Sequence, residues 1–342
     1  MENQEKQHKR RVRYKGTHPR NYKERYKELQ PEKYPETIEK VIRKGSTPVG
    51  MHISICVKEI LDFLQIQPGQ RGLDATLGYG GHTLEMLKCL KGEGHLYALD
   101  VDTVESAKTK ERLQKLGYGE EILTIKNINF RDIDKVCEEA GKFDFVLADL
   151  GVSSMQIDNP ERGFTYKKEG PLDLRLNQKK GVSAAERLKE VTMEELEGMF
   201  VENADEPYAH EIAEKIFAKL RRGEAIDTTT KLQQIIEEAL KFIPEKERKE
   251  AVKKSCQRTF QALRIDVNSE FEVLYEFMEK LPNVLKEGGR VAILTFHSGE
   301  DRIVKRAFKE LKRAVFTVTL QTMLYVRLRR NVTITAVQNQ QK

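Results

Sequence analysis

The chain has 342 residues, of which 39% are hydrophobic and 33% are charged. This length allows one domain with a large insertion, and the apolar content is sufficient for a buried core. No apolar run approaches the roughly 20 residues of a membrane helix, and the basic, polar N-terminus lacks the apolar stretch of a signal peptide. Composition therefore excludes a membrane-spanning protein and predicts a cytoplasmic one.

The positive charge is concentrated at the N-terminus. Residues 1–30 contain ten lysines and arginines against four acidic residues, a net charge of +6 that equals the net charge of the whole chain. Three tyrosines, Tyr14, Tyr22 and Tyr26, alternate with these basic residues. Basic side chains neutralise phosphates and tyrosine rings stack on bases. We interpret residues 1–45 as a basic extension that contacts nucleic acid, with a solubilising tail as the alternative.

The cysteines indicate neither a zinc site nor a disulfide framework. They are far apart and form no C-x-x-C pair. We predict reduced, packed cysteines and no metal site. The four are Cys56, Cys89, Cys137 and Cys256.

The first half of the chain alternates strand and helix patterns. A helical pattern over 53–64 ends at Pro68-Gly69. Strand patterns follow at 72–77, 95–99, 122–125 and 143–149. Helical patterns separate them at 83–90, 103–116 and 132–140. This alternation predicts an α/β fold with a parallel sheet, whose ligands bind at the carboxyl ends of the strands.

A glycine loop over residues 78–81 joins the first of these strands to its helix. Glycines let the backbone approach a ligand closely, and Asp100, about 20 residues further on, suits a carboxylate that binds a ribose. The dinucleotide fingerprint requires glycine or alanine where this chain has Thr83. S-adenosylmethionine has no pyrophosphate and carries two positive groups, which suit Asp74 and Asp100. We favour this cofactor over NAD, with an ordinary glycine turn as the remaining alternative.

The second half begins with a polar helical insertion over residues 158–262. Its helical patterns lie at 184–200, 208–222, 231–241 and 245–257. A helix at 271–286 and a buried strand at 290–296 follow, and alternating residues predict last strands at 315–320 and 332–337. The insertion therefore lies between two strands of one sheet, and we assign residues 46–157 and 263–342 to the sheet domain.

Polar residues follow two of the strands. Asp149 could accept a hydrogen bond from an amine or cap the next segment, and Gly151 lets a planar substrate approach. His297 follows the strand over 290–296 and is a candidate base. Ser298, next to it, is predicted to cap the following helix. Asp149 and His297 are our catalytic candidates.

Basic, aromatic and amide side chains of the insertion are candidates for contact with RNA. Packing in a loop or in the core is the alternative for each. These candidates are Arg162, Phe164, Arg175, Arg258, Arg264 and Asn268.

Seven motifs occur in one order along the chain: LDATLGYGGHT, DLGVSSMQID, RGFTY, GPLDLR, ENADEPYAHEIA, RTFQALRIDVNSE and FHSGEDRIVKR. From about His52 to about Lys312 the chain resembles the MraW/RsmH family of bacterial methyltransferases. The resemblance implies a class I S-adenosylmethionine-dependent methyltransferase sheet, Rossmann-like, with an inserted helical subdomain for substrate recognition. The implied reaction is methylation of N4 of a cytidine in 16S rRNA of the small ribosomal subunit. The implied cofactor contacts are Gly80, Gly81, His82, Asp100, Phe130, Asp149 and Gln156.

The chain departs from the family pattern in places. Gly299 stands where the family has leucine, and residues 313–342 differ from its usual ending. Amino-methyltransferases of DNA carry Asp/Asn-Pro-Pro-Tyr where this chain has Asp149-Leu150-Gly151-Val152, so no stacking tyrosine is transferred. Two alternatives stay open, a methyltransferase of the same fold that acts on another RNA or a protein, and a non-catalytic ribosome-assembly factor. The oligomeric state is also open, with a homodimer as one alternative.

Overall fold

The structure is a computed structural model and describes residues 54–314, 323–329 and 332–338. The predicted basic extension over 1–45 and the predicted strand over 315–320 lie outside these residues. Among the helices of the described part, none combines the length and the apolar character that a membrane span requires.

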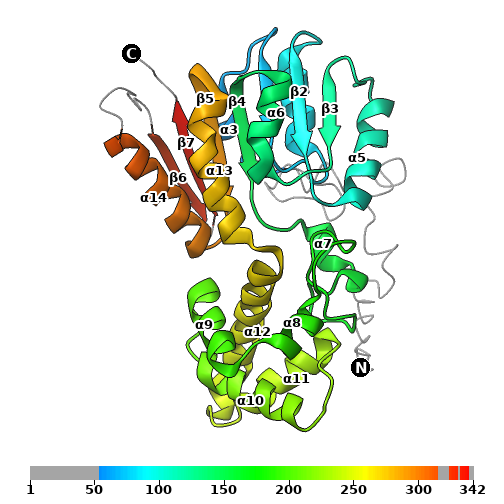
Figure 1. The fold of residues 1–342 in the computed structure, drawn as a ribbon, viewed down its shortest axis with the longest axis vertical. Coiled ribbons are helices and arrows are strands. Elements are labelled where there is room, and N and C mark those ends of the chain that lie inside the picture. Colours follow the sequence, from blue (N-terminus) through cyan, green and yellow to red (C-terminus); the bar gives the residue numbers. More distant parts are fainter. Residues whose placement is uncertain (1–53, 315–322, 330–331, 339–342) are drawn as a thin grey trace, which may run out of the picture. The chain divides into compact units, whose positions relative to one another are not determined.

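A seven-stranded sheet forms the first part of the fold, with the order β3-β2-β1-β4-β5-β7-β6 (Figure 1). Its strands are β1 (Arg71–Asp74), β2 (His95–Leu99), β3 (Leu123–Lys126), β4 (Phe143–Asp149), β5 (Leu285–Thr295), β6 (Met323–Arg329) and β7 (Val332–Gln338). Strands β1 to β5 are parallel, whereas β7 is antiparallel to both β5 and β6. The strand order reverses between β1 and β4, which is where open α/β sheets bind ligands. The predicted parallel α/β sheet is confirmed.

Helices cover the sheet because its strands are apolar on both faces. The helices of this part are α3 (Val57–Leu64), α4 (Gly81–Leu90), α5 (Thr103–Lys115), α6 (Ile133–Ala140), α13 (Glu270–Val284) and α14 (Ser298–Ala314), with a 3-10 turn, η2 (Phe130–Asp132). One core cluster joins strand residues such as Val146 and Ile293 to Val136 of α6, Phe277 of α13 and Val304 of α14. These helices therefore fix the carboxyl edge of β1, β4 and β5.

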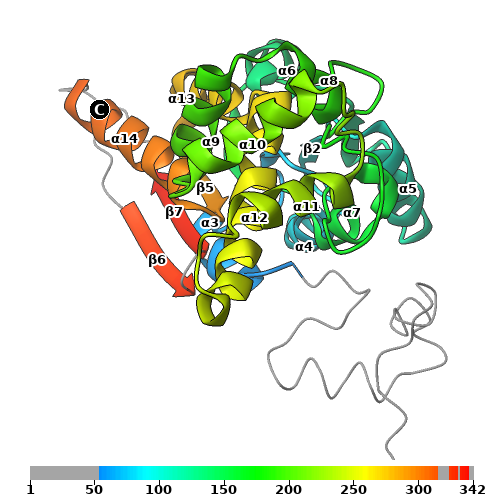
Figure 2. The same cartoon turned by 90° about the horizontal axis from the view of Figure 1, so that it is seen from below.

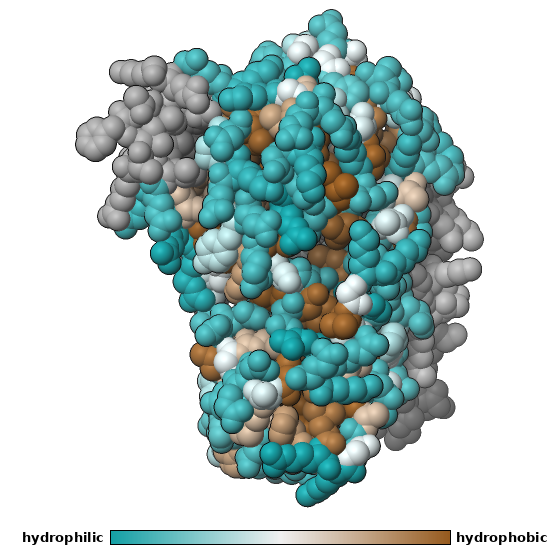
Figure 3. Space-filling model, viewed as in Figure 1, coloured by the Kyte–Doolittle hydropathy of each residue, from teal (hydrophilic) through white to brown (hydrophobic). Residues whose placement is uncertain are grey.

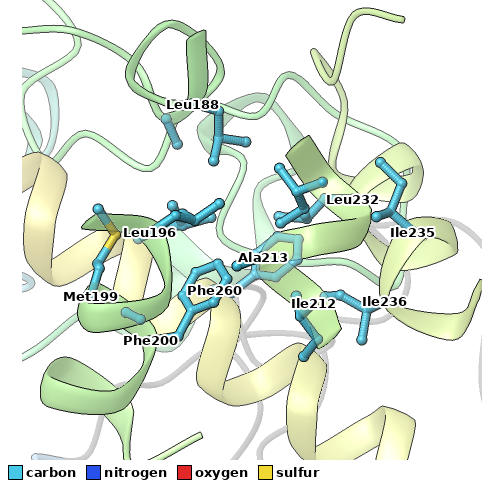
Figure 4. Packing of buried hydrophobic residues seen from close by; sticks show 14 of the residues in the cluster. Leu188, Leu196, Met199, Phe200, Ile212, Ala213, Leu232, Ile235, Ile236 and Phe260 are labelled. Carbon is cyan, nitrogen blue, oxygen red and sulfur yellow. The ribbon is translucent and has the colours of Figure 1, made fainter. Parts of the chain in front are cut away.

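The inserted segment is helical and has a core of its own. It contains α7 (Ser154–Asp158), a 3-10 turn η3 (Pro160–Arg162), α8 (Ala184–Glu190), α9 (Met193–Ala204), α10 (Ala209–Arg221), α11 (Thr229–Ala239) and α12 (Glu245–Asn268). Figure 2 shows α9 to α12 together. In Figure 4, Phe200, Ile212, Leu232 and Phe260 from these four helices point toward one another, and all four are buried. The insertion thus buries its apolar faces within itself.

Two sequence predictions for the insertion were wrong in detail. The predicted helix over 184–200 is two helices, α8 and α9, because Thr192 and Glu195 form a capping box that starts a new helix. The helix predicted over 245–257 continues to Asn268, so the predicted boundary at 262/263 lies inside α12. The face in Figure 3 is mostly hydrophilic with separate hydrophobic patches, as the charged composition leads us to expect.

Strand β5 begins earlier than predicted. The pattern placed its start at 290, but Leu285 already pairs with Phe143, and an irregularity in register follows. Strand β7 lies where a last strand was predicted, whereas β6 was not predicted.

We expect Gly72→Ala to destabilise the protein by about 1–3 kcal/mol, since an added methyl group in a packed core forces other groups to move. A Cβ at this position would lie 2.0 Å from the ring of Phe145, which is fully buried. The matched control is Gly198→Ala in α9, where a Cβ meets nothing within 4 Å. Alanine there should stabilise the helix by about 0.5–1 kcal/mol. Denaturant unfolding of both variants measures the difference, and equal effects would contradict the register of β1.

Candidate active site

Three carboxylates gather at the carboxyl edge of the sheet. Asp74 ends β1, Asp149 ends β4, and Asp100 directly follows β2. These strands are neighbours and parallel, so their carboxyl ends meet at one edge. The backbone N–H of Asp149 donates to the Thr76 hydroxyl at 2.7 Å, which ties the end of β4 to the turn after β1.

The glycine loop lies against this edge and is held from two sides. The N–H of Gly78 donates to Asp100 Oδ2 at 2.8 Å, and the Gly78 carbonyl accepts from the Thr109 hydroxyl of α5 at 2.7 Å. Gly80 precedes α4 with a φ of 75°, and a Cβ there would lie 2.7 Å from Thr109 Cγ2. Because a side chain at Gly80 would collide with α5, this position requires glycine.

The buried carboxyl groups at this edge are only partly compensated. Asp100 accepts from the N–H groups of Gly78 and Asp102, yet burial outweighs these bonds and raises the pKa of Asp100 to about 6. Burial also raises the pKa of Asp74, although the Thr83 hydroxyl donates to it at 2.6 Å. Carboxyl groups with raised pKa values at one edge of a sheet are typical of a functional site.

Asp149 faces the start of α4. Its Oδ2 lies 3.4 Å from Nδ1 of His82, which is 7% exposed. The other oxygen, Oδ1, is buried and has no hydrogen-bond partner among the described residues. A buried carboxylate oxygen of this kind needs a donor, since an unmade hydrogen bond is costly.

The remaining implied cofactor contacts lie close to the same edge. Phe130 begins η2, just after β3, and its ring meets Phe277 edge-on at 5.1 Å between centroids. Gln156 of α7 donates to Asp102 Oδ2 at 3.2 Å. The structure therefore brings the seven residues implied by the resemblance to the ends of β1, β2, β3 and β4 and to α7.

This arrangement fits S-adenosylmethionine. Asp100, which holds the glycine loop through the N–H of Gly78, can also accept from ribose hydroxyls. The partly compensated acids at Asp74, Asp100 and Asp149 suit a ligand with positive ammonium and sulfonium groups.

His297 lies in an ion-pair network next to this edge. Its Nε2 is 3.1 Å from Glu300 Oε1, and its ring lies 5.9 Å from that of Phe271. Burial would raise the pKa of Glu300, but the bond from His297 and the N–H of Phe296 keep it below its usual value. A Cβ at Gly299 would lie 2.5 Å from Phe271, so glycine at this position makes room for the ring.

Two further contacts define the surroundings of His297. Arg264 donates to both oxygens of Glu270, at 2.9 and 3.0 Å, so the acidic groups here are paired with cations. The Ser298 hydroxyl donates to Asp205 Oδ2 at 3.1 Å. The capping role predicted for Ser298 is wrong, because α14 begins at Ser298 itself and His297 Nδ1 accepts from the N–H of Glu300 at 3.4 Å.

The predicted RNA contacts are mostly buried or paired. Phe164 belongs to the core of the insertion, and Arg162 is 6% exposed. Arg175 forms a bidentate ion pair with Asp173. The Asn268 side chain bonds the backbone of Leu174 and Leu176, and Arg264 holds Glu270. Among the six candidates, the side chain of Arg258 is exposed to 39%, and it lies 4.0 Å from Glu206.

Sequence reasoning missed Asp102 and Asp205. Asp102 stands two residues after Asp100 in the run LDVD and caps α5 through the N–H groups of Val104 and Glu105. An acid directly before a helical pattern is a capping signal that the sequence did contain. Asp205 has a left-handed φ of 50°, and nothing in the sequence pattern marks its contact with α14.

Comparison with known proteins supports the resemblance to the MraW/RsmH family that the motifs indicated. Residues 50–338 match the model of the MraW methylase family. The chain is 72% identical over 313 residues to the ribosomal RNA small subunit methyltransferase H 1 of Lachnoclostridium phytofermentans, covering 92% of this chain and 86% of that protein. It is 66% identical over 306 residues to the protein of the same name from Agathobacter rectalis, covering 90% of this chain and 88% of that protein.

The fold and the carboxylate edge define a class I methyltransferase, an enzyme whose cofactor is S-adenosylmethionine. The chain belongs to the MraW methylase family.

The raised pKa of Asp100 predicts that cofactor affinity depends on pH. Below a pKa of about 6 the carboxyl group takes up a proton, so it loses the charge that attracts a positive ligand. We expect the Kd for S-adenosylmethionine to rise as pH falls from about 7.5 to about 5, approaching tenfold per unit below the pKa. Isothermal titration calorimetry measures this, with Asp100→Asn as the control. The variant should bind weakly with a shallower pH slope, and a flat wild-type profile would contradict the assignment.

Proposed function

We propose that this protein methylates N4 of a cytidine in 16S rRNA of the small ribosomal subunit. The observation that carries the proposal is Asp149, whose buried Oδ1 has no partner among the described residues at the edge where the cofactor fits. The names of the relatives, which are small-subunit rRNA methyltransferases, support this substrate. The reaction takes place in the cytoplasm, where small subunits assemble.

S-adenosylmethionine supplies an electrophilic methyl group, so the chemistry requires mainly that the protein positions the attacking nitrogen. The exocyclic amine of cytosine is a poor nucleophile, because its lone pair is delocalised into the ring. Asp149 Oδ1 accepts a hydrogen bond from this amine and orients the lone pair toward the methyl carbon. The amine nitrogen loses a proton on methylation, and Asp149 would accept it.

His82 keeps Asp149 in place. Its Nδ1 lies 3.4 Å from Oδ2. This contact leaves Oδ1 for a hydrogen bond from the substrate amine. The proton taken by Asp149 can pass to solvent, since this side chain is 28% exposed. His297, 12% exposed in its own network with Glu300, is a second candidate to contact the base.

We propose that residues 158–262 recognise the RNA. Gly151, with a φ of 90°, lies near Phe296 at the edge of the sheet and leaves room for a flat base, which must leave its surroundings to react. Arg258 of α12 is the exposed candidate for a phosphate contact. The other candidates support this surface through packing, ion pairs and hydrogen bonds. They are Phe164, Arg175, Arg264 and Asn268.

The experiment is transfer of labelled methyl from S-adenosylmethionine to small subunits that lack the modification, followed by nucleoside analysis. We expect label in N4-methylcytidine. Label in another nucleoside or in protein would favour the same-fold methyltransferase with a different target. Cofactor and subunit binding without transfer would favour a non-catalytic assembly factor.

Asp149→Asn should lower kcat by about 100-fold or more, because an amide accepts weakly and cannot take the proton. Cofactor affinity should change much less than kcat, and this split separates a catalytic role from a binding one. The matched control is Asp144→Asn, an acid at the other end of β4 that pairs with Lys286. Full turnover by Asp149→Asn would remove Asp149 from the mechanism.

A further inference from the structure

Arg162 is a buried cation outside the set of residues implied to touch the cofactor. It ends η3 and is 6% exposed. A buried guanidinium is costly unless it is paired and hydrogen-bonded. Its position therefore requires a reason other than the contact with RNA that the sequence suggested.

The guanidinium of Arg162 joins two parts of the chain. Its Nη1 donates to Asp102 Oδ2 at 2.6 Å, across 60 positions of sequence. Its Nη2 donates to the carbonyls of Leu176 at 2.8 Å and of Arg175 at 3.3 Å. Both partners of the ion pair are nearly inaccessible, with side chains 8% and 3% exposed.

Asp102 stands between two implied cofactor contacts. Its N–H donates to Asp100 Oδ1 at 2.8 Å, and its Oδ2 accepts from Gln156 Nε2 at 3.2 Å. Its Oδ1 caps α5. Burial would raise the pKa of Asp102, but the bonds from Arg162 and from the start of α5 hold it below its usual value. The carboxylate thus stays charged and fixed.

Further bonds hold the segment on the other side of Arg162. The N–H of Leu176 donates to Asn268 Oδ1 at 2.7 Å, and Asn268 Nδ2 donates to the carbonyl of Leu174 at 2.8 Å. The residues bound by Arg162 are therefore fixed to the end of α12. Arg162 itself is held on a rigid support rather than on a free loop.

We propose that Arg162 is a positioning residue of the cofactor site, which acts through Asp102 to hold Asp100 and Gln156 in their binding geometry. Without the guanidinium, Asp102 is a buried charge with too few partners, and it turns toward other donors or takes up a proton. Gln156 then loses its acceptor on Asp102, and the turn after β2 that holds Asp100 changes its conformation at the same time. The inference concerns cofactor affinity and goes beyond the RNA substrate proposed above.

Calorimetric titration with S-adenosylmethionine tests this in the full chain, below the unfolding transition of each variant. Arg162→Met should weaken binding roughly tenfold or more, the size expected for losing bonds to a charged group. Arg162→Lys keeps the positive charge but loses the planar guanidinium. Its Kd should therefore lie between those of the wild-type protein and of Arg162→Met. The matched control is Arg187→Met, which removes an ion pair of 2.8 Å to Asp266 within the insertion. It should lower thermal stability and leave the Kd unchanged.

A double-mutant cycle separates positioning from a general loss of structure. Asp102→Asn removes the charge that Arg162 compensates, so Arg162→Met should cost much less affinity in that background. Should Arg162→Met fail to fold, Arg162→Lys and its combination with Asp102→Asn complete the cycle. An unchanged Kd in the Arg162 variants, additive losses, or an equal loss in Arg187→Met would overturn the proposal. None of these results depends on the RNA, so they stand apart from a failure of methyl transfer.

Discussion

The parallel pairing of β2, β1 and β4 is the constraint on which the rest of the structure depends. It brings the ends of three strands to one edge, and each of these ends carries an aspartate. Burying carboxyl groups at this edge is unfavourable, and burial is the main cause of the raised pKa values of Asp74 and Asp100. The helices and the separate core of the insertion supply the stability that allows such an edge. A positive cofactor compensates these buried carboxylates, and this links the fold to the reaction.

The insertion meets the sheet through polar contacts that the sequence pattern does not show. Arg162 bonds Asp102, and Asp205 accepts from Ser298. Each joins residues that are about 60 or more positions apart, next to an implied site residue. Polar contacts therefore join the insertion to the edge of the sheet, although the two cores are distinct.

Periodicity and turn residues predicted much of the fold. Strands β2 and β4 have the predicted bounds, because their apolar runs end at charged or turn residues. The break between α8 and α9 was missed although Thr192 and Glu195 form a recognisable capping box. Strand β6 could not be predicted from alternation alone, since its pairing with β7 is a tertiary contact.

The sequence predicted the acids of the candidate site better than the environment of its arginines, and the reason is physical. Residues at strand ends, such as Asp100 and Asp149, follow from topology, because parallel strands direct their carboxyl ends to one place. Whether an arginine reaches solvent depends on partners far along the chain, so Arg162 and Arg264 could not be distinguished from surface residues by sequence.

The most direct test of the central claim is a crystal structure of the chain with S-adenosylhomocysteine. We predict that the ribose hydroxyls lie within hydrogen-bond distance of Asp100 and that the sulfur lies on the side of Asp149. An adenosine bound away from the ends of β1, β2 and β4 would contradict the account of the carboxylate edge.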